Sequence, residues 1–206
     1  MIAIIDYGVG NIFSIKRSLD YLGFTSVLTE DPKTLAISER IILPGVGAFS
    51  DAKEKLDSSG MVEPLLAEIK KGKPTLGICL GMQLLFEKSL EYGETEGLSL
   101  IPGYVEDMKK LICDKSLNIP QMGWNKLDFP KDKEKSPLFK YIKEGDSVYF
   151  VHSYSAVDCE DYLIASTDYS YPVTAAVAKD NLYGVQFHPE KSGEVGLNIL
   201  KAFGEL

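Results

Sequence analysis

Short apolar runs alternate with amphipathic segments in the first half of the chain, and this order restricts the fold more than any other sequence feature. Buried strands are predicted at Ile2–Asp6, Ser26–Glu30, Arg40–Leu43 and Pro74–Ile78. Helices are predicted after Asn11 as far as Gly23, over Met61–Lys71, and from Leu80 to about Leu90. Strands that alternate with helices indicate a parallel sheet covered on both faces. We therefore expect a three-layer α/β/α domain.

The second half changes character, because strands dominate it. They are predicted at Leu98–Met108, Gln121–Phe129, Asp146–Val157, Tyr162–Asp168, Val173–Lys179 and Leu182–Phe187. Tight turns such as Lys179-Asp180-Asn181 join several of them and favour an antiparallel extension of a mainly parallel central sheet. A helix is predicted at Gly193–Phe203, and the charged run Lys131–Lys135 is expected to be a surface loop. A length of 206 residues, without repeats or linkers, fits a single domain over 1–206.

Charge excludes some classes of partner. The 30 acidic and 22 basic residues give a net charge of −8, so nucleic acid and anionic membranes are poor candidates. Arg17 and Arg40 are the only arginines, which argues against a dedicated multi-phosphate site. The longest apolar stretch, Thr75–Phe86, is too short for a membrane span, and Met1 leads directly into a predicted strand without a signal peptide. We expect a soluble, cytoplasmic protein.

Three cysteines, Cys79, Cys113 and Cys159, cannot all pair, and no two have a CxxC or metal-ligand spacing. Neither a disulfide framework nor a zinc site is expected. Cys79 differs from the others because it lies in Gly77-Ile78-Cys79-Leu80-Gly81, where a predicted strand turns sharply into a helix. This pattern is typical of a nucleophile elbow: the glycines allow close approach of strand and helix, and the helix amino terminus favours the thiolate. The plainer alternative is a small core residue.

A cysteine nucleophile needs a base within hydrogen-bond reach, and the chain contains only His152 and His188. His188 is favoured because it follows a predicted strand and precedes Pro189 and Glu190. On an extended segment, side chains two positions apart point the same way, so Glu190 can orient the imidazole. The sequence thus predicts a triad of Cys79, His188 and Glu190.

Glycines also follow the third predicted strand, in Pro44-Gly45-Val46-Gly47. If this strand lies beside the strand that leads to Cys79, the backbone N–H groups of Val46 and Leu80 can stabilise an oxyanion. The alternative is a glycine-rich turn without a catalytic role.

Together, the Gly-x-Cys-x-Gly elbow, the His-Pro-Glu segment and the proline-glycine segment resemble those of the class I (triad) glutamine amidotransferases. The resemblance covers the whole chain. Within that family, four longer motifs are similar to those of the glutaminase subunits of imidazole glycerol phosphate synthases, enzymes of histidine biosynthesis: 6–11, 44–49, 121–125 and 188–192.

This resemblance implies residue roles and a partner. Gln83, Gly47, Ser153 and Tyr154 match positions that hold the substrate glutamine. Positions facing a (β/α)₈-barrel synthase subunit, which receives the ammonia in a heterodimer, match Asn11, Met122, Trp124, Tyr149 and Lys191. Trp124 could instead pack in the core, and Asn11 could be a helix cap. Gln121 replaces a histidine that is frequent in the family.

The expected chemistry is hydrolysis of glutamine to glutamate and ammonia through a Cys79 thioester, with no metal or other cofactor. Two alternatives remain open. The chain could serve a different acceptor enzyme, such as one that amidates a sugar, or it could be a non-catalytic interaction subunit that has kept the fold.

Overall fold

A seven-stranded sheet forms the centre of the protein, in the order β11-β12-β13-β4-β3-β1-β2. The computed structural model describes all residues from 1 to 206. Five of the strands are mutually parallel: β1 (Ile2–Ile5), β2 (Ser26–Thr29), β3 (Arg40–Leu43), β4 (Thr75–Ile78) and β13 (Leu182–Val185). Two antiparallel strands, β11 (Leu163–Asp168) and β12 (Pro172–Lys179), continue the sheet at one edge. The predicted sheet, mainly parallel with an antiparallel extension, is confirmed.

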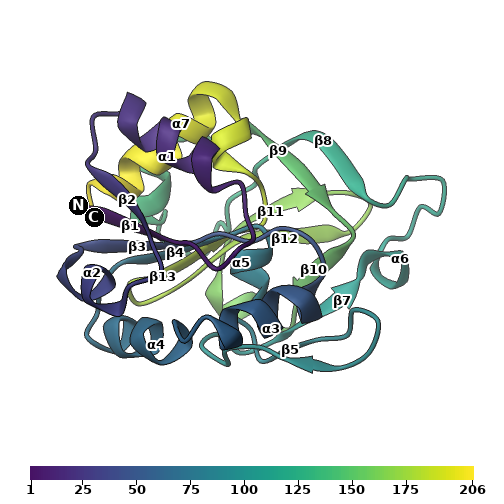
Figure 1. The fold of residues 1–206 in the computed structure, drawn as a ribbon. Helices are drawn as coiled ribbons and strands as arrows, with labels where there is room; N and C mark the ends of the chain where they lie inside the picture. The colour runs from purple at the N-terminus through teal and green to yellow at the C-terminus, as the bar shows by residue number, and fades with distance from the viewer.

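Helices cover both faces of this sheet (Figure 1). One face carries α1 (Ile12–Tyr21), α7 (Gly193–Gly204) and a short 3-10 helix at Pro137–Phe139. The opposite face carries α2 (Pro32–Ile37), α3 (Phe49–Ser58), α4 (Val62–Lys70) and α5 (Leu80–Gln83). The three-layer α/β/α architecture is therefore confirmed. None of the helices has the length and apolar character needed to span a membrane.

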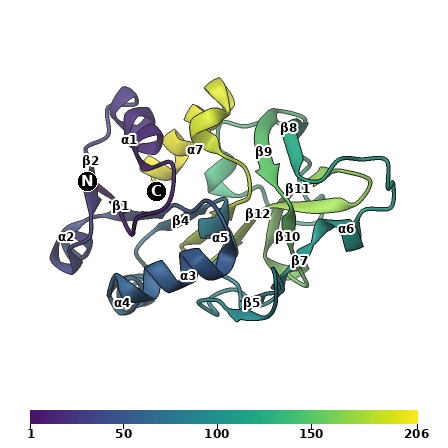
Figure 2. The same ribbon diagram turned by 45° about the vertical axis from the view of Figure 1, so that its right-hand side comes forward.

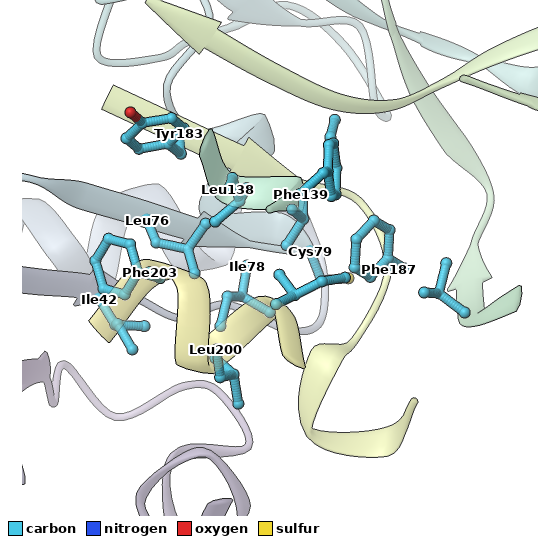
Figure 3. Packing of buried hydrophobic residues seen from close by; sticks show 14 of the residues in the cluster. Ile42, Leu76, Ile78, Cys79, Leu138, Phe139, Tyr183, Phe187, Leu200 and Phe203 are labelled. Carbon is cyan, nitrogen blue, oxygen red and sulfur yellow. The ribbon is translucent and has the colours of Figure 1, made fainter. Parts of the chain in front are cut away.

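Alternation of side chains along each strand divides the core in two. In β1, Ile2 and Ile4 pack under α1 and α7, whereas Ala3 and Ile5 pack under the other helices. All four are essentially inaccessible to solvent. Each face buries 23 apolar side chains, which explains why the strands are almost continuously hydrophobic. Figure 3 shows the α1/α7 side of this core, where Phe203 lies close to Ile42 and Leu200 lies close to Ile78.

Two smaller sheets lie beside the central one (Figure 2). The first has the order β10-β7-β5-β6 and contains β5 (Lys88–Ser89), β6 (Thr95–Glu96), β7 (Tyr104–Asp107) and β10 (Tyr154–Val157). The second is a hairpin of β8 (Gln121–Lys126) and β9 (Ser147–His152). One helical turn, α6 (Met108–Leu111), follows β7.

Three of the predicted strands are therefore too long. The segment 98–108 is a strand only near its end. Within 121–129 the strand ends at Lys126, and Asp128 adds one isolated bridge to Ser166. The segment 146–157 is two strands that belong to different sheets. The chain changes partner at Ser153, because β9 pairs with β8 whereas β10 pairs with β7. Apolar alternation shows which residues are buried but not against which strand they pair.

The helix predicted from Leu80 to about Leu90 is wrong, since α5 ends at Gln83. The carbonyl oxygens of Leu84 and Phe86 accept hydrogen bonds from the N–H groups of Leu98 and Ser99, which replaces helical bonding. Gly97 permits this docking, because a Cβ there would lie 2.1 Å from the Phe86 carbonyl oxygen.

Three helices, α2, α3 and the single turn α6, were not predicted, although Asp31 caps α2 and Pro32 occupies its first turn. The charged run 131–135 is irregular, as predicted, but Lys133 is not merely solvated: its ammonium group donates to the carbonyls of Glu160, Asp161 and Leu163.

Candidate active site

Cys79 lies at a sharp turn between β4 and α5. Its backbone has φ 55° and ψ −112°, a conformation that costs energy for a residue with a Cβ. The two flanking glycines allow this turn: a Cβ on Gly77 would lie 2.7 Å from the Gly81 carbonyl oxygen, and a Cβ on Gly81 would lie 2.0 Å from the Leu43 carbonyl oxygen. The predicted close approach of strand and helix is present.

His188 lies beside Cys79 because β13 pairs with β4 in parallel, with Val185 opposite Ile78. The His188 Nδ1 and Glu190 Oε1 atoms are 2.8 Å apart, and the His188 ring lines the same cavity as Cys79. Burial alone would lower the pKa of His188, but its interactions with Cys79 and Glu190 and their negative charges raise it to about 10. The imidazole can therefore hold a proton next to the sulfur at neutral pH. The three residues of the predicted triad are together.

Two further side chains hold this arrangement. Asn11 donates from Nδ2 to Glu190 Oε1 at 3.2 Å, and Ser192 donates from Oγ to the His188 carbonyl oxygen at 2.6 Å. Asn11 occupies the N-cap position of α1 but makes no side-chain cap bond, so the helix-cap interpretation is wrong. Its side chain instead orients the carboxylate that orients the imidazole.

The segment Pro44–Gly47 lies next to the elbow because β3 pairs with β4. A Cβ on Gly45 would be 2.6 Å from the Gly81 backbone nitrogen, so only glycine allows this contact. Tyr7 donates its hydroxyl to the Pro44 carbonyl oxygen at 2.6 Å and ties the segment to the end of β1. Burial, and then the nearby Cys79, raise the pKa of Tyr7.

A cavity of about 750 Å³ opens over Cys79 and His188. All other residues predicted for the oxyanion site and for substrate line it: Val46, Gly47, Leu80, Gln83, Ser153 and Tyr154. The Gln83 side chain forms both of its hydrogen bonds through Nε2, to the Tyr154 carbonyl oxygen at 3.2 Å and to Gln186 Oε1 at 2.9 Å. Its own Oε1 remains available as an acceptor.

Glu91 was missed by the sequence analysis. Its side chain lines the cavity, and its Oε2 accepts the Phe49 N–H at 2.7 Å. Burial raises the pKa of Glu91, although the Phe49 N–H opposes this effect. No motif surrounds Glu91, so only its position in the folded chain identifies it.

The second histidine has a different environment. His152 is buried, its Nδ1 lies 2.7 Å from the Tyr154 carbonyl oxygen, and its Nε2 has no partner. Burial lowers the pKa of His152 to about 4, so the ring is neutral at physiological pH. It shapes the turn at Ser153 and does not bond to Cys79.

Of the residues predicted to face a partner, Lys191 lines the cavity, and Met122 lies on β8 opposite Val151, which also lines it. Met122 and Trp124 are 63% and 56% exposed, so the core-packing interpretation of Trp124 is wrong. The Trp124 ring contacts Tyr149 edge to face at 6.1 Å, and exposed Lys191 lines the cavity itself. Gln121, in contrast, is fully buried and donates to Asn125 Oδ1 at 3.1 Å.

All three cysteines are unpaired. Cys113 is exposed, whereas Cys159 is buried with its sulfur 3.7 Å from Thr174 Oγ1. Neither lines the cavity.

Comparison with known proteins agrees with this geometry. The family model described as "Glutamine amidotransferase class-I" matches residues 3–204. The chain belongs to this family. Membership in the class I glutamine amidotransferases makes it an enzyme subunit of the glutaminase type.

Relatives and solved structures extend the match over the full chain. "Imidazole glycerol phosphate synthase subunit HisH" of Caldanaerobacter subterraneus subsp. tengcongensis is 51% identical and covers 100% of this chain and 98% of the relative. The protein of the same name from Geobacter sulfurreducens is 47% identical, with 100% and 98% covered. A crystal structure of a glutamine amidotransferase has a TM-score of 0.74 at 16% identity, covering 99% of this chain and 100% of that one. The structure of PurLQS from Thermotoga maritima has a TM-score of 0.71 at 18% identity, covering 98% and 96%. These two structures share the fold.

Glu190→Gln keeps the shape of the side chain but removes its charge. We expect the turnover number for glutamate release to fall about 10²-fold, less than on replacement of Cys79, because the imidazole is still present but less well oriented. The His188 titration, followed by NMR, should move to lower pH because one of the charges that raises its pKa is gone. Glu194→Gln, an equal charge change at an exposed position of α7, is the control. Full turnover in Glu190→Gln would reduce the triad to a Cys-His pair.

Proposed function

We propose that this chain is the glutaminase subunit of an imidazole glycerol phosphate synthase, which hydrolyses glutamine and passes the ammonia to a second subunit in histidine biosynthesis. The observation that carries the proposal is the Cys79, His188 and Glu190 arrangement at the base of the cavity. The names of full-length relatives at 44–51% identity supply the pathway. They favour this function over a glutaminase for a sugar-modifying enzyme.

The first step forms a thioester. The Cys79 thiolate attacks the carboxamide carbon of glutamine, and the N–H groups of Val46 and Leu80 bind the oxygen as it becomes negative. The protonated His188 gives its proton to the departing nitrogen, so that ammonia leaves as the C–N bond breaks.

The second step hydrolyses the thioester. His188, now neutral, takes a proton from water, and the hydroxide attacks the same carbonyl carbon. The C–S bond breaks, glutamate leaves, and the thiolate and imidazolium pair is restored. Glu190 holds the ring in the required tautomer throughout and takes no proton.

Recognition of the amino-acid end of glutamine uses a second group of residues that line the cavity, apart from Cys79 and His188. The ammonium group of glutamine needs acceptors and a negative charge, which Gln83 Oε1 and the Glu91 carboxylate provide. Ser153, Tyr154 and Gly47 enclose the rest of the amino-acid end. No metal or organic cofactor takes part in either step.

The partner is a (β/α)₈-barrel synthase subunit that docks over the mouth of the cavity and forms a heterodimer. Met122 and Trp124 offer exposed apolar surface there, next to Lys191, Tyr149 and Asn11. The scarcity of arginine in this chain agrees with phosphate binding by the partner. We place both subunits in the cytoplasm, where the biosynthetic reaction needs its substrates.

Glutamate release should depend on the partner. We expect the isolated chain to be a poor glutaminase, and the complex with the partner's ribotide to be about 10²–10³-fold faster, which is the effect of one oxyanion donor. Gly45 and Gly47 let the Val46 peptide adopt two orientations at small cost, and the partner would bind the active one more tightly. Rates measured for the chain, the complex and the complex with ribotide test this. Equal rates in all three would contradict it, and activation only by a sugar-modifying partner would support the alternative function.

A further inference from the structure

We propose that Gln186 positions the Cys79 sulfur and connects it to the glutamine-binding wall of the cavity. The inference rests on the proposed function in one respect, because it takes Cys79 to be the nucleophile. Gln186 lies between β13 and His188, is completely buried, and does not line the cavity.

The Gln186 amide has a partner at each end. Its Nε2 donates to Cys79 Sγ at 3.8 Å, and its Oε1 accepts from Gln83 Nε2 at 2.9 Å. Both partners line the cavity, one at the reacting atom and the other at the wall that faces the amino-acid end of the substrate. Gln186 thus bridges the two parts of the site from behind.

A backbone carbonyl determines which way both amides point. The Tyr154 carbonyl oxygen can only accept, so the Gln83 atom 3.2 Å away must be its nitrogen. That same nitrogen faces Gln186, which must therefore present its oxygen to Gln83 and its N–H to the sulfur. His152 donates to the same carbonyl oxygen, at 2.7 Å, and holds it in place.

This orientation has a chemical consequence. A thiolate is an acceptor and gains from each donor directed at it, and a bond from a neutral donor to a charged acceptor is stronger than one between neutral groups. His188 carries a proton near Cys79, but it must give that proton to the leaving nitrogen. The Gln186 amide keeps its protons at every pH, so it continues to hold the sulfur after His188 has transferred its own.

Gln186→Met tests this role, since methionine has nearly the same length and no N–H donor. We expect the pH midpoint for alkylation of Cys79 by iodoacetamide, measured in the whole complex, to rise by about one unit, so that the alkylation rate at pH values below the midpoint falls about 10-fold. The turnover number for glutamine should fall by a similar factor. Gln186→Glu, which replaces the donor with a negative acceptor, should shift the midpoint further.

Thr174→Val is the control because it removes a different buried polar group: a hydroxyl that bonds the Ala156 carbonyl on β10 and lies near Cys159 Sγ, with no hydrogen bond to Cys79. It should leave the alkylation midpoint unchanged. An unchanged midpoint in both Gln186 variants would overturn the proposal. If neither variant folds, the wild-type protein provides the test. The NMR chemical shifts of the Gln186 side-chain amide protons should change with pH at the same midpoint as the alkylation of Cys79. Chemical shifts that do not change with pH would overturn the proposal.

The alkylation measurement does not require glutaminase activity. A wild-type complex that releases no glutamate would refute the proposed function, while the Gln186 midpoints would still report on the contact with sulfur. The synthesis of imidazole glycerol phosphate from added ammonium should be normal in all variants, because the partner subunit's reaction needs only free ammonia.

Discussion

Cys79→Ser should abolish the synthesis of imidazole glycerol phosphate from glutamine by the complex of this chain with its proposed partner, with a loss of about 10⁴-fold or more. Synthesis of the same product from added ammonium should be unchanged. Serine is nearly isosteric with cysteine. Its hydroxyl, unlike a thiol, stays protonated beside an imidazolium at neutral pH, so no anionic nucleophile remains. The partner's chemistry needs only free ammonia. Parallel assays with glutamine and with ammonium separate loss of the nucleophile from loss of the complex.

Cys113→Ser is the matched control for this substitution, because Cys113 is exposed and lies outside the cavity. It should retain full activity with glutamine. A glutamine analogue that carries a diazo-ketone should label Cys79 and leave Cys113 and Cys159 unmodified, as determined by peptide mapping. Labelling of either other cysteine with Cys79 unreacted would refute the assignment of the nucleophile.

Gly81→Ala should have a large effect through backbone contact alone. The new Cβ would lie 2.0 Å from the Leu43 carbonyl oxygen and 3.1 Å from the Pro44 carbonyl carbon, so α5 and the segment 44–47 must separate. Overpacking of this kind costs about 3 kcal/mol of unfolding free energy. Because a displacement of about 1 Å at a reacting site costs roughly 10²-fold in rate, glutamate release should fall by at least that factor.

Thermal unfolding and glutamate release of the purified variant measure these two losses. Gly60→Ala provides the comparison: Gly60 has a positive φ but open space around its Cβ position, far from the cavity. It should lose about 1 kcal/mol from backbone strain and no activity. Wild-type stability and turnover in Gly81→Ala would show that the close approach of strand, helix and oxyanion segment is not required.

The chemistry-bearing residues were predictable because parallel strands impose a simple geometry. Cys79, His188 and Pro44–Gly47 each follow a buried strand, and the carboxyl ends of parallel strands meet at one edge of the sheet. The glycines of the elbow also indicated their purpose, because a tight strand-to-helix turn leaves no room for a Cβ.

Residues that act through long-range contact were not predictable. Asn11 was expected at a partner interface or as a helix cap, yet it bonds to Glu190, which is 179 positions away. Glu91 and Gln186 carry no motif, and their roles depend on β13, α5 and the turn after β5 lying around one cavity. The end of α5 at Gln83 likewise depends on segment 97–101, which occupies carbonyls that a longer helix would have used.

By itself, the sequence determined the layered fold, the parallel order of the first strands and the positions of Cys79, His188 and Glu190. It could do so because short, continuously apolar runs that alternate with amphipathic segments indicate strands buried between helices, and because the elbow needs its glycines at fixed positions. Only the tertiary structure decided where strands 98–108 and 146–157 divide, and which polar side chains reach the triad from behind. Those outcomes depend on pairing and hydrogen bonding between distant segments, and a local sequence pattern does not show with which distant segment it will pair.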